Sequence, residues 1–485
     1  MIVVALLLAV AWMVAATGTA SAATIVVNGV TCTLADAITA ANSDTATGGC
    51  PAGNGADTLD LVTDITLTSR LPDITSDVAI LGNGHTVRRS PSAPAFGILW
   101  IDSYQSVTID NITITGGTLE GGIRAEYEAH VTITNSLITE NSAASRGGGI
   151  FCDLCFVTVT NSVISDNTAI TGGGGIHLRG ALRATRPSND HVASKTGPDT
   201  GVWNVLLRNS TLCNNTADTG GGLYTTGAGN YLLEKTTLRG NSARLGGGVY
   251  NFDSGGTIEN STLSGNTATE QGGAIYLRSG APPFYSGVII NLNNSTVTDS
   301  SAPFGAGLYI QSDAPPDPPY AVATLRPHNS IMAAQDNGAD CVIVGPALIE
   351  SQGYNIESAT SCGFTATGDQ QNVTAAMLNL APLANNGGPT WTHALTSGSA
   401  AIDQGNCPNV AADQRGYPRP IDQPGVPNAA DGCDVGAFEL QVPTAVTGTT
   451  LTADNRPASS PSLLMIVVVL IASLLLAKHR RITGA

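Results

Sequence analysis

Two acidic residues of this sequence share a spacing that could bring their carboxylates together. Glu140 and Asp166 each lie five residues after the first asparagine of a repeated segment. If these segments stack as successive coils, the carboxylates lie about 5 Å apart. There they could hold Ca²⁺, or repel each other and raise one pKa. Two solvated turn residues are the simpler interpretation, because other residue types fill the next three copies: Asn214, Gly240 and Gly265.

A second group of chemically capable residues lies in a segment that interrupts the repeats. The stretch 182–191 combines arginine, aspartate and histidine. Loops that leave a rigid scaffold are common places for binding sites, so this insertion is a candidate site. The simpler alternative is a plain surface insertion. Further along the chain, His393 and Asp403 fit buried turn and capping roles.

The elements that must position these residues come from an internal repeat of about 25 residues. Each copy begins with an alternation such as Val-Thr-Ile-Thr, which predicts a strand with one buried face. An Asn-Ser turn, a short second strand and a polar turn ending in glycines follow. One copy cannot bury its apolar face alone, so copies must stack. Five clear copies begin at Val131, Val157, Val205, Tyr231 and Thr257, with weaker ones at Val107 and Leu292.

Stacking predicts an all-β fold, a right-handed single-stranded parallel β-helix of the pectin-lyase-like kind, from about Thr58 to about Ala400. A leucine-rich repeat has a similar period, but its L-x-x-L-x-L core is absent. Stacked coils place equivalent residues ~4.8 Å apart. One column of asparagines therefore predicts an inward-facing ladder in which each amide donates and accepts. The ladder residues are Asn141, Asn167, Asn215, Asn241 and Asn266.

The repeats resemble those of chlamydial polymorphic outer-membrane proteins, since L/I-x-x-N is paired with G-G-A/G-I. The family's usual Phe is replaced by Ile138, Ile164, Leu212, Leu238 and Leu263. Near the N-terminus, Cys32–Ile38 (CTLADAI) is similar to the CSLREA motif, with Ala35 and Asp36 in place of its Arg and Glu. The apolar spacing of this stretch predicts a helix that caps the open end of the stack.

The C-terminal part, about Asn329 to Leu440, resembles the choice-of-anchor Q family of bacterial surface proteins. This resemblance implies a surface location and a module that closes the stack, and it implies no defined reaction. It rests on Asn337–Cys341, Gly353–Ile356, Cys362–Phe364, Asn385–Thr390 with His393–Leu395, Gly398–Gly405, Asp413–Gly416 and Cys433–Glu439.

Both ends of the chain predict export and anchoring. Residues 1–22 are apolar and end in Ala20-Ser21-Ala22, as in a secretory signal peptide. Residues 461–477 form a second apolar stretch, followed by a basic cluster that is typical of a cytoplasmic flank. Before Pro461, 18 Lys and Arg stand against 37 Asp and Glu, a net charge of −19. This charge argues against a nucleic-acid partner and is compatible with Ca²⁺.

Nine cysteines in an exported chain predict disulfides. We predict three pairs, Cys32 with Cys50, Cys341 with Cys362 and Cys407 with Cys433. Each closes a loop of roughly 17–25 residues, which is worth about 3 kcal/mol in the loop-entropy model. Cys213 is then left over. Cys152 and Cys155 form a single CxxC, which we interpret as structural because no thioredoxin-like pattern surrounds it.

These features predict seven segments: signal peptide 1–22, N-terminal cap 23–60, β-helix repeats 61–328, closing module 329–440, linker 441–460, transmembrane anchor 461–477 and basic cytoplasmic tail 478–485. The body lies outside the plasma membrane. We expect a structural, adhesive or glycan-binding surface protein without defined catalysis or a resident cofactor, and its partner is an extracellular glycan or a surface protein.

The alternative is a surface polysaccharide lyase or glycoside hydrolase, since parallel β-helices include pectate lyases and polygalacturonases. Such enzymes cluster carboxylates beside a Lys or Arg on one lateral face. The Asn-Thr-Asp, Asp-Asp and Gly-His-Gly sets of polygalacturonases are missing from the sequence. Gly84-His85-Thr86 is a weak echo of the last set and fits a turn.

Overall fold

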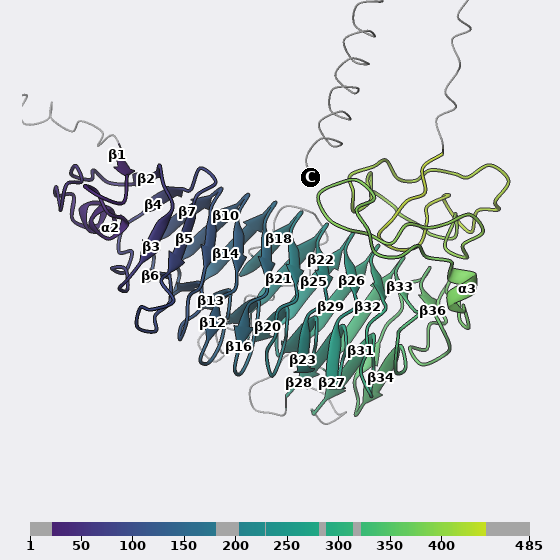
Figure 1. Cartoon of the computed structure of the whole chain (residues 1–485). Coiled ribbons are helices and arrows are strands. Elements are labelled where there is room, and N and C mark those ends of the chain that lie inside the picture. Colours follow the sequence, from purple (N-terminus) through teal and green to yellow (C-terminus); the bar gives the residue numbers. More distant parts are fainter. Residues whose placement is uncertain (1–21, 181–202, 228, 281–287, 314–321, 443–485) are drawn as a thin grey trace, which may run out of the picture. The chain divides into compact units, whose positions relative to one another are not determined.

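The computed structural model describes residues 22–180, 203–227, 229–280, 288–313 and 322–442. Three long sheets, each purely parallel in its pairing, run along the molecule, and successive coils contribute one strand to each (Figure 1). Sheet 1 has 12 strands: β1 (Thr24–Val27), β2 (Asp57–Leu61), β4 (Val78–Leu81), β7 (Ser106–Asp110), β10 (His130–Thr134), β14 (Phe156–Thr160), β18 (Val205–Arg208), β21 (Asn230–Glu234), β25 (Gly255–Glu259), β29 (Ile289–Asn293), β32 (Thr324–His328) and β35 (Leu348–Ile349).

Sheets 2 and 3 complete the three sides of each coil. Sheet 2 has 11 strands: β3 (Ile65–Leu67), β5 (Thr86–Arg89), β8 (Thr113–Thr115), β11 (Leu137–Thr139), β15 (Val163–Ser165), β19 (Thr211–Cys213), β22 (Thr237–Arg239), β26 (Thr262–Ser264), β30 (Thr296–Thr298), β33 (Ile331–Met332) and β36 (Ile356–Glu357). Sheet 3 has nine strands: β6 (Leu99–Ile101), β9 (Ile123–Ala125), β13 (Ile150–Asp153), β17 (Ile176–Arg179), β20 (Leu223–Thr226), β24 (Val249–Phe252), β28 (Ile275–Ser279), β31 (Leu308–Ser312) and β34 (Cys341–Val344).

Two short pairs lie in the turn between sheets 2 and 3. They are β12 (Ser142–Ala143) with β16 (Thr168–Ala169), and β23 (Ser242–Leu245) with β27 (Thr267–Gln271). We refer to all strands from β1 to β36 as the repeat stack. Its register follows the repeat, because Ile138 lies beside Ile164 and Leu212 beside Leu238 in sheet 2. These side chains are fully buried and form part of one continuous apolar core.

The repeats satisfy their buried polar groups with ladders that run from coil to coil. In the predicted asparagine column, each side-chain Nδ2 donates to Oδ1 of the next asparagine at 3.0 Å, from Asn141 to Asn266. Each Oδ1 also accepts the backbone N–H of the preceding asparagine. A second ladder of hydroxyls, which our sequence analysis did not predict, receives backbone N–H groups in the same way: Ser136, Ser162, Ser210, Ser261, Ser295 and Ser330.

The first asparagine of each repeat has a different role, which is conformational. It occupies the left-handed region at the turn between sheets 1 and 2, with φ near 50° at Asn135, Asn161 and Asn209. Asparagine tolerates this region better than most other residues except glycine. Lys235 fills the same position in one coil, with φ 52°, so the turn does not strictly require asparagine.

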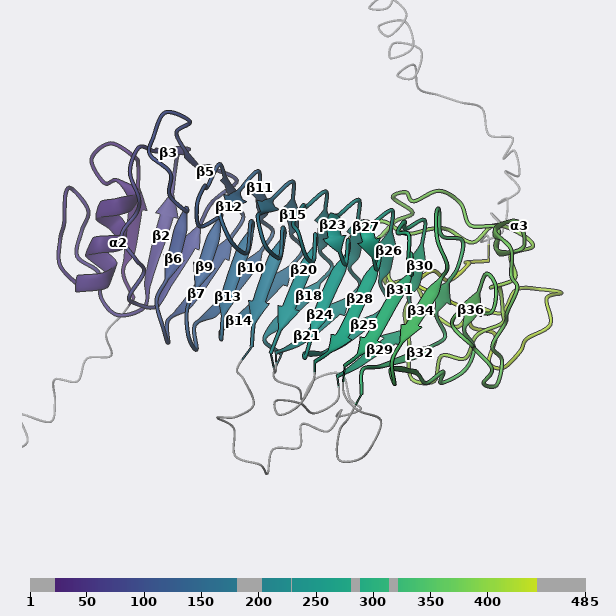
Figure 2. The ribbon, with the colours of Figure 1, turned by 90° about the horizontal axis from the view of Figure 1, so that it is seen from below.

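A helix forms in the N-terminal stretch where the sequence predicts one. α2 (Leu34–Ser43) begins after Thr33, whose hydroxyl accepts the N–H of Asp36. Its buried face is Leu34, Ala37, Ile38, Ala40 and Ala41. Figure 2 shows α2 at the N-terminal end of the sheets. Because β1 and β2 already pair with each other, the sheets begin before the predicted boundary at residue 61.

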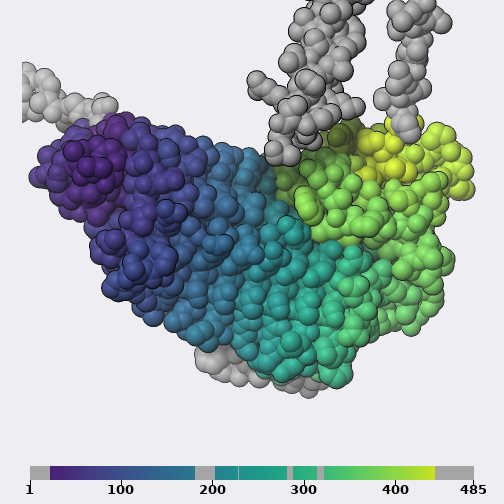
Figure 3. Space-filling view, in the orientation of Figure 1, coloured from purple at the N-terminus to yellow at the C-terminus, as the bar shows by residue number. Residues whose placement is uncertain are grey.

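The other end departs further from the prediction. The last strand, β36, ends at Glu357, well short of Ala400. Residues 370–440, which we call the C-terminal segment, contain the short helix α3 (Ala375–Leu378) and turn back along the outer face of sheet 2. Figure 3 shows these green to yellow residues lying against the later coils. This segment lacks the strand alternation of the repeats, so it packs on the side of the stack instead of adding coils to it.

Hydrogen bonds join the C-terminal segment to several coils. The hydroxyl of Thr237 donates to the carbonyl of Trp391 at 2.6 Å, and that of Thr262 to Oε1 of Gln414 at 2.6 Å. Nearer the end of the stack, the N–H of Ala437 donates to Thr296 at 3.1 Å. A shared apolar core lies beneath these contacts and includes Ile331, Ile356, Leu395, Val435 and Phe438.

Four disulfides are present among the described residues. The three pairs that the sequence predicts are formed, Cys32–Cys50, Cys341–Cys362 and Cys407–Cys433. Cys152 and Cys155 form the fourth. Cys213 is free and buried.

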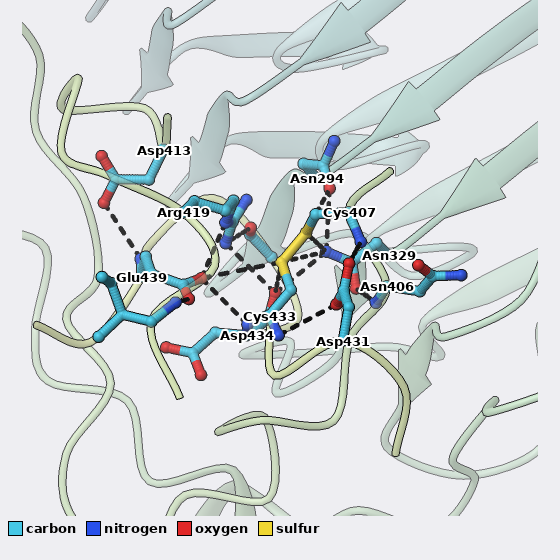
Figure 4. Close-up of a disulfide and its surroundings, with 12 residues drawn as sticks. Asn294, Asn329, Asn406, Cys407, Asp413, Arg419, Asp431, Cys433, Asp434 and Glu439 are labelled. Carbon is cyan, nitrogen blue, oxygen red and sulfur yellow. Dashed lines mark hydrogen bonds and ion pairs between the residues drawn. A yellow bond between two sulfur atoms is a disulfide. The ribbon is translucent and has the colours of Figure 1, made fainter. Parts of the chain in front are cut away.

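A buried polar network surrounds Cys407–Cys433 (Figure 4). Asn329 donates to Oδ1 of Asn294 at 2.9 Å and to the carbonyl of Asp434 at 3.0 Å. Arg419 pairs with Glu439 at 2.8 Å, and both side chains are fully buried.

The predicted membrane-related segments cannot be placed in this fold. Residues 1–21, which hold nearly all of the predicted signal peptide, lie outside the described residues, and so does the predicted anchor 461–477. Within the described part of the chain, no helix has the length and apolar character needed to cross a membrane.

Candidate functional site

A cleft of about 390 Å³ opens where the C-terminal segment meets the outer face of sheet 2. Both parts of the molecule line it. The stack supplies the last residue of β30 and the turns that follow β30 and β33, and the C-terminal segment supplies α3, the residues after it and one histidine. The lining residues are Thr298, Asp299, Ala334, Asp336, Ala375, Leu378, Leu380, Ala381, Pro382 and His393.

Two carboxylates give the cleft its charge. Asp299 follows β30 at the left-handed turn position, with φ 53°. Asp336 lies one coil further on, and its backbone N–H donates to the carbonyl of Ser300 at 3.0 Å. Burial first, and then repulsion by Asp299, raise the pKa of Asp336 above its usual value. Among the described residues, no Lys or Arg forms an ion pair with either carboxylate.

His393 forms the inner wall of the cleft. Its Nδ1 lies 2.8 Å from the carbonyl of Ala381, and its Nε2 lies 2.9 Å from Oγ of Ser264. A carbonyl can only accept, so Nδ1 carries the proton and Nε2 of the neutral ring accepts from the serine hydroxyl. Burial lowers the pKa of His393, while the Ala381 carbonyl and Asp299, whose Oδ2 lies 3.5 Å from Nε2, act in the opposite direction.

The hydrogen bond from Ser264 to His393 has the geometry of a nucleophile and its base. The serine side chain is buried, however, and it does not line the cleft. A substrate could reach its hydroxyl only if the C-terminal segment moved. We therefore interpret Ser264 and His393 as a contact that fixes the segment on the stack.

The acidic residues that the sequence proposed as a pair lie elsewhere. Glu140 and Asp166 are exposed, and both occupy left-handed turn positions, with φ 54° and 56°. Oδ1 of Asp166 accepts from Asn214 at 3.2 Å. Among the described residues, no group of three His, Cys, Asp or Glu is placed to hold a metal ion. Solvated turn residues therefore describe this pair well.

The other described residues that the sequence suggested as candidates make contacts that stabilise the fold. His85 lies beside Asp64 on an exposed turn, 3.2 Å apart. Asp403 is fully buried, and its carboxylate accepts the N–H of Gln423. Burial raises the pKa of Asp403. The insertion 182–191 lies outside the described residues.

Sequence reasoning missed both cleft carboxylates, although one signal was available. Asp299 lies five residues after Asn294 and so occupies the same repeat position as Glu140 and Asp166. The weaker copy that begins at Leu292 therefore carries the third acid of that column. Nothing local to the sequence indicates that the C-terminal segment returns to cover this position.

A second cluster of charged groups lies at the turn between sheets 3 and 1. Arg278 pairs with Asp313 at 2.6 Å, and Asp253 accepts the N–H of Gly280 at 2.9 Å. Burial raises the pKa of Asp253 to about 6, and the Asp313 charge adds to this shift. Tyr276 joins the cluster through its hydrogen bond to Gln311.

Two family models match parts of this chain. A family model described as right handed beta helix region matches residues 76–197, and a Chlamydia polymorphic membrane protein repeat matches residues 260–278. Among solved structures, the crystal structure of pectate lyase Pel9A is similar, with 11% identity, a TM-score of 0.42, and coverage of 87% of this chain and 98% of that chain. A search of curated proteins found no match.

The two family models confirm part of the sequence prediction. The chain contains a right-handed parallel β-helix, and one of its coils carries a repeat of the polymorphic-membrane-protein type. Neither match reaches Cys32–Ile38 or residues 329–440. The resemblances to the CSLREA motif and to the choice-of-anchor Q family therefore remain predictions.

Proposed function

We propose that this protein is an exported cell-surface protein whose β-helix is a rigid scaffold for a ligand-binding cleft. One observation carries the proposal. The cleft is preformed at the junction of two regions, and hydrogen bonds from several coils hold those regions together. Its volume of about 390 Å³ lies in the roughly 300–1,000 Å³ range of small-molecule sites.

The surface location rests on the sequence and on the matched repeat. The apolar residues 1–22 act as the export signal, and residues 461–477 with the basic tail anchor the body outside the plasma membrane. A repeat of the polymorphic-membrane-protein type in the described stack supports a surface protein. The choice-of-anchor Q likeness of residues 329–440 points the same way. In this proposal α2 caps the first coil, since it packs at the end where sheet 1 begins.

Binding fits the site better than catalysis does. The histidine of the cleft is occupied by Ser264 and the Ala381 carbonyl, and the two carboxylates lack a neighbouring Lys or Arg among the described residues. The partner that presents the ligand is an extracellular glycan or a surface protein.

One observation favours the alternative of a polysaccharide lyase or hydrolase. Asp253 and Asp313 lie near the same arginine, and their environments differ. Arg278 pairs with Asp313, whereas burial holds the pKa of Asp253 at about 6. Carboxyl groups in unequal environments can divide the acid and base roles of glycoside cleavage. Cleavage of an acidic polysaccharide that is lost in Asp253→Asn would support this alternative over the proposed binding role.

The proposal can be tested with a substitution that fills the cleft. Ala375 is exposed, lies at the start of α3 and lines the cleft, so Ala375→Trp should occupy the space without disturbing the stack. The purified full chain is screened by isothermal titration calorimetry against alkylamines, carboxylates, neutral oligosaccharides and Ca²⁺. We expect at least one ligand that binds the native chain and fails to bind Ala375→Trp. Equal binding by the native chain and by Ala375→Trp would contradict the proposal, and so would the absence of binding by any ligand class.

Export needs its own measurement. Protease added to intact cells should degrade the body of the protein while leaving cytoplasmic markers untouched. Protection of the body in intact cells, with cleavage after lysis, would show that it is not on the surface.

A further inference from the structure

The chemistry of the cleft narrows the class of ligand, and this step rests on the proposed binding function. Its two sides differ in character. The stack contributes the carboxylates Asp299 and Asp336, and the C-terminal segment contributes apolar groups that include Leu380 and Pro382. We infer that the cleft binds a primary alkylammonium group, with the ammonium between the carboxylates and its aliphatic chain against the apolar wall.

The charge balance of the cleft supports a cation. The side chain of Asp299 is 45% exposed, and Asp336 is exposed as well. Among the described residues, His393 is the only basic group that lines the cleft, and burial lowers the pKa of its ring. Two carboxylates in one recess repel each other. A bound ammonium relieves this repulsion and forms charge-assisted hydrogen bonds.

The apolar wall distinguishes an organic amine from a metal ion. Ca²⁺ prefers six to eight oxygen ligands. Among the residues that line the cleft, the side-chain oxygens are those of Thr298, Asp299 and Asp336, and the rest of the lining is apolar apart from His393. An alkyl chain of four to six carbons, by contrast, gains from burial against Leu380 and Pro382. A lysine side chain has the same chemistry, so a free alkylamine and a lysine of a surface protein are two sources of one ligand class.

The repeat position of Asp299 provides a closely matched pair of variants. Asp299 and Asp166 occupy the same repeat position with φ 53° and 56°, a region that asparagine also tolerates. Asp299→Asn therefore removes a cleft charge with little backbone cost. Asp166→Asn makes the identical change on a coil that does not line the cleft.

The test is calorimetric titration of the full chain and its variants with n-hexylammonium chloride. Hexanoate serves as the anionic probe of equal length, CaCl₂ as the metal, and Nα-acetyl-lysine amide as the lysine probe. We expect hexylammonium to bind, Asp299→Asn and Asp336→Asn each to weaken it at least tenfold, and Asp166→Asn to leave it unchanged. Stronger binding of the lysine probe than of hexylammonium would assign the source to a protein partner, and the reverse order to a free amine.

Several outcomes would overturn the inference. These are equal binding of hexanoate, equal binding by Asp299→Asn, or displacement of hexylammonium by an equimolar amount of Ca²⁺. If another ligand class binds and Ala375→Trp blocks it, the cleft is still the binding site and only the alkylammonium assignment fails. If nothing binds in the cleft, the proposed function fails together with it. Circular dichroism of each variant confirms that a loss of binding is not a loss of folding.

Discussion

The repeat stack and the C-terminal segment both bury polar side chains, and they satisfy them in different ways. In the stack, one solution is repeated on five successive coils, as Asn167 and Asn215 show by donating to the next amide at 3.0 Å. In the C-terminal segment, each buried group has its own set of partners, which no other residue repeats. Arg419 pairs with Glu439 and also donates to the carbonyl of Gly436 at 2.8 Å.

This difference determines how each region should respond to damage. A ladder distributes its hydrogen bonds, so the loss of one rung affects two neighbouring coils and leaves the others intact. A network of contacts that are not repeated has no such reserve, because several buried groups share the same partners in a water-poor interior. We therefore expect the largest effects of single substitutions in the C-terminal segment, and smaller effects in the stack.

The largest effect should follow from Arg419→Met. This change leaves Glu439 and Asp434 buried without their cation, and removing one member of a buried pair costs about 3–5 kcal/mol. Urea unfolding of the purified chain measures the loss. Arg244→Met is the matched control, because its partners Asp218 and Glu270 are exposed, and it should cost less than about 1 kcal/mol. Equal losses of unfolding free energy in the two variants would show that the buried network around Arg419 contributes no more to stability than the exposed ion pairs of Arg244.

A smaller loss of stability is expected when one asparagine of the ladder is removed. Asn215→Ala removes the acceptor of the Asn167 backbone and side-chain N–H groups and the donor to the carbonyl of Ile164. Unsatisfied buried groups cost about 1–3 kcal/mol each, and local adjustment recovers part of this, so we expect roughly 2–4 kcal/mol. Thermal unfolding followed by circular dichroism is the measurement.

The neighbouring residue provides the control for that rung. Asn214 is exposed with φ 56°, and glycine fills its position in the next two coils, at Gly240 and Gly265. Asn214→Gly should therefore change the unfolding free energy by only about 0.5 kcal/mol. If Asn215→Ala were equally mild, the ladder would contribute little to stability.

The same contrast explains what the sequence could predict. The stack, its strand register and the column from Asn141 to Asn266 follow from a repeated pattern, in which every copy restates the same local rule. The hydroxyl ladder was missed, although Ser136, Ser162 and Ser210 recur at one position, because an Asn-Ser pair was read only as a turn. A column of equivalent residues can thus be found from the sequence once it is known that their side chains point into the core.

The cleft could not be predicted in this way. It depends on contacts such as Ser264 with His393, which are 129 residues apart, and Thr237 with Gln414, which are 177 apart. A single long-range contact leaves no periodic trace. The sequence placed the C-terminal part at the end of the stack, and only the structure places residues 370–440 along its side.

The pH dependence of the unfolding free energy should differ between the two regions, and we expect this effect to be moderate. Burial and the charge of Glu439 raise the pKa of Asp434 to about 7, above its value of ~3.9 in the unfolded chain. The folded state thus binds this proton more tightly, so the stability that it contributes is present below pH 4 and is lost as the pH rises through 7. One such group allows a slope of at most about 1.4 kcal/mol per pH unit.

Two variants show which region of the molecule causes the slope of unfolding free energy with pH. Asp434→Asn should flatten the fall in unfolding free energy between pH 4 and 7. Asp253→Asn, in the stack, should flatten it only between pH 4 and 6, because burial raises the pKa of Asp253 to about 6. Urea titrations at each half pH unit give the slopes. A slope that neither variant changes would mean that other groups control this pH range.

The smallest effect is expected at Cys213, where the stack tolerates variation on its outer face. Cys213 lies in register with Ser165 on the preceding coil and Arg239 on the next coil, and Ser264 fills the same position two coils after Cys213. Because this position accepts serine on other coils, Cys213→Ser should change the unfolding free energy by less than about 1 kcal/mol. Burial also raises the pKa of the Cys213 thiol and hides it from reagents. Iodoacetamide should therefore label it in urea and not in the native protein, as read by mass spectrometry of the intact chain. Rapid labelling of the native protein would show that this coil opens readily, and the stack would then be less uniform than its ladders indicate.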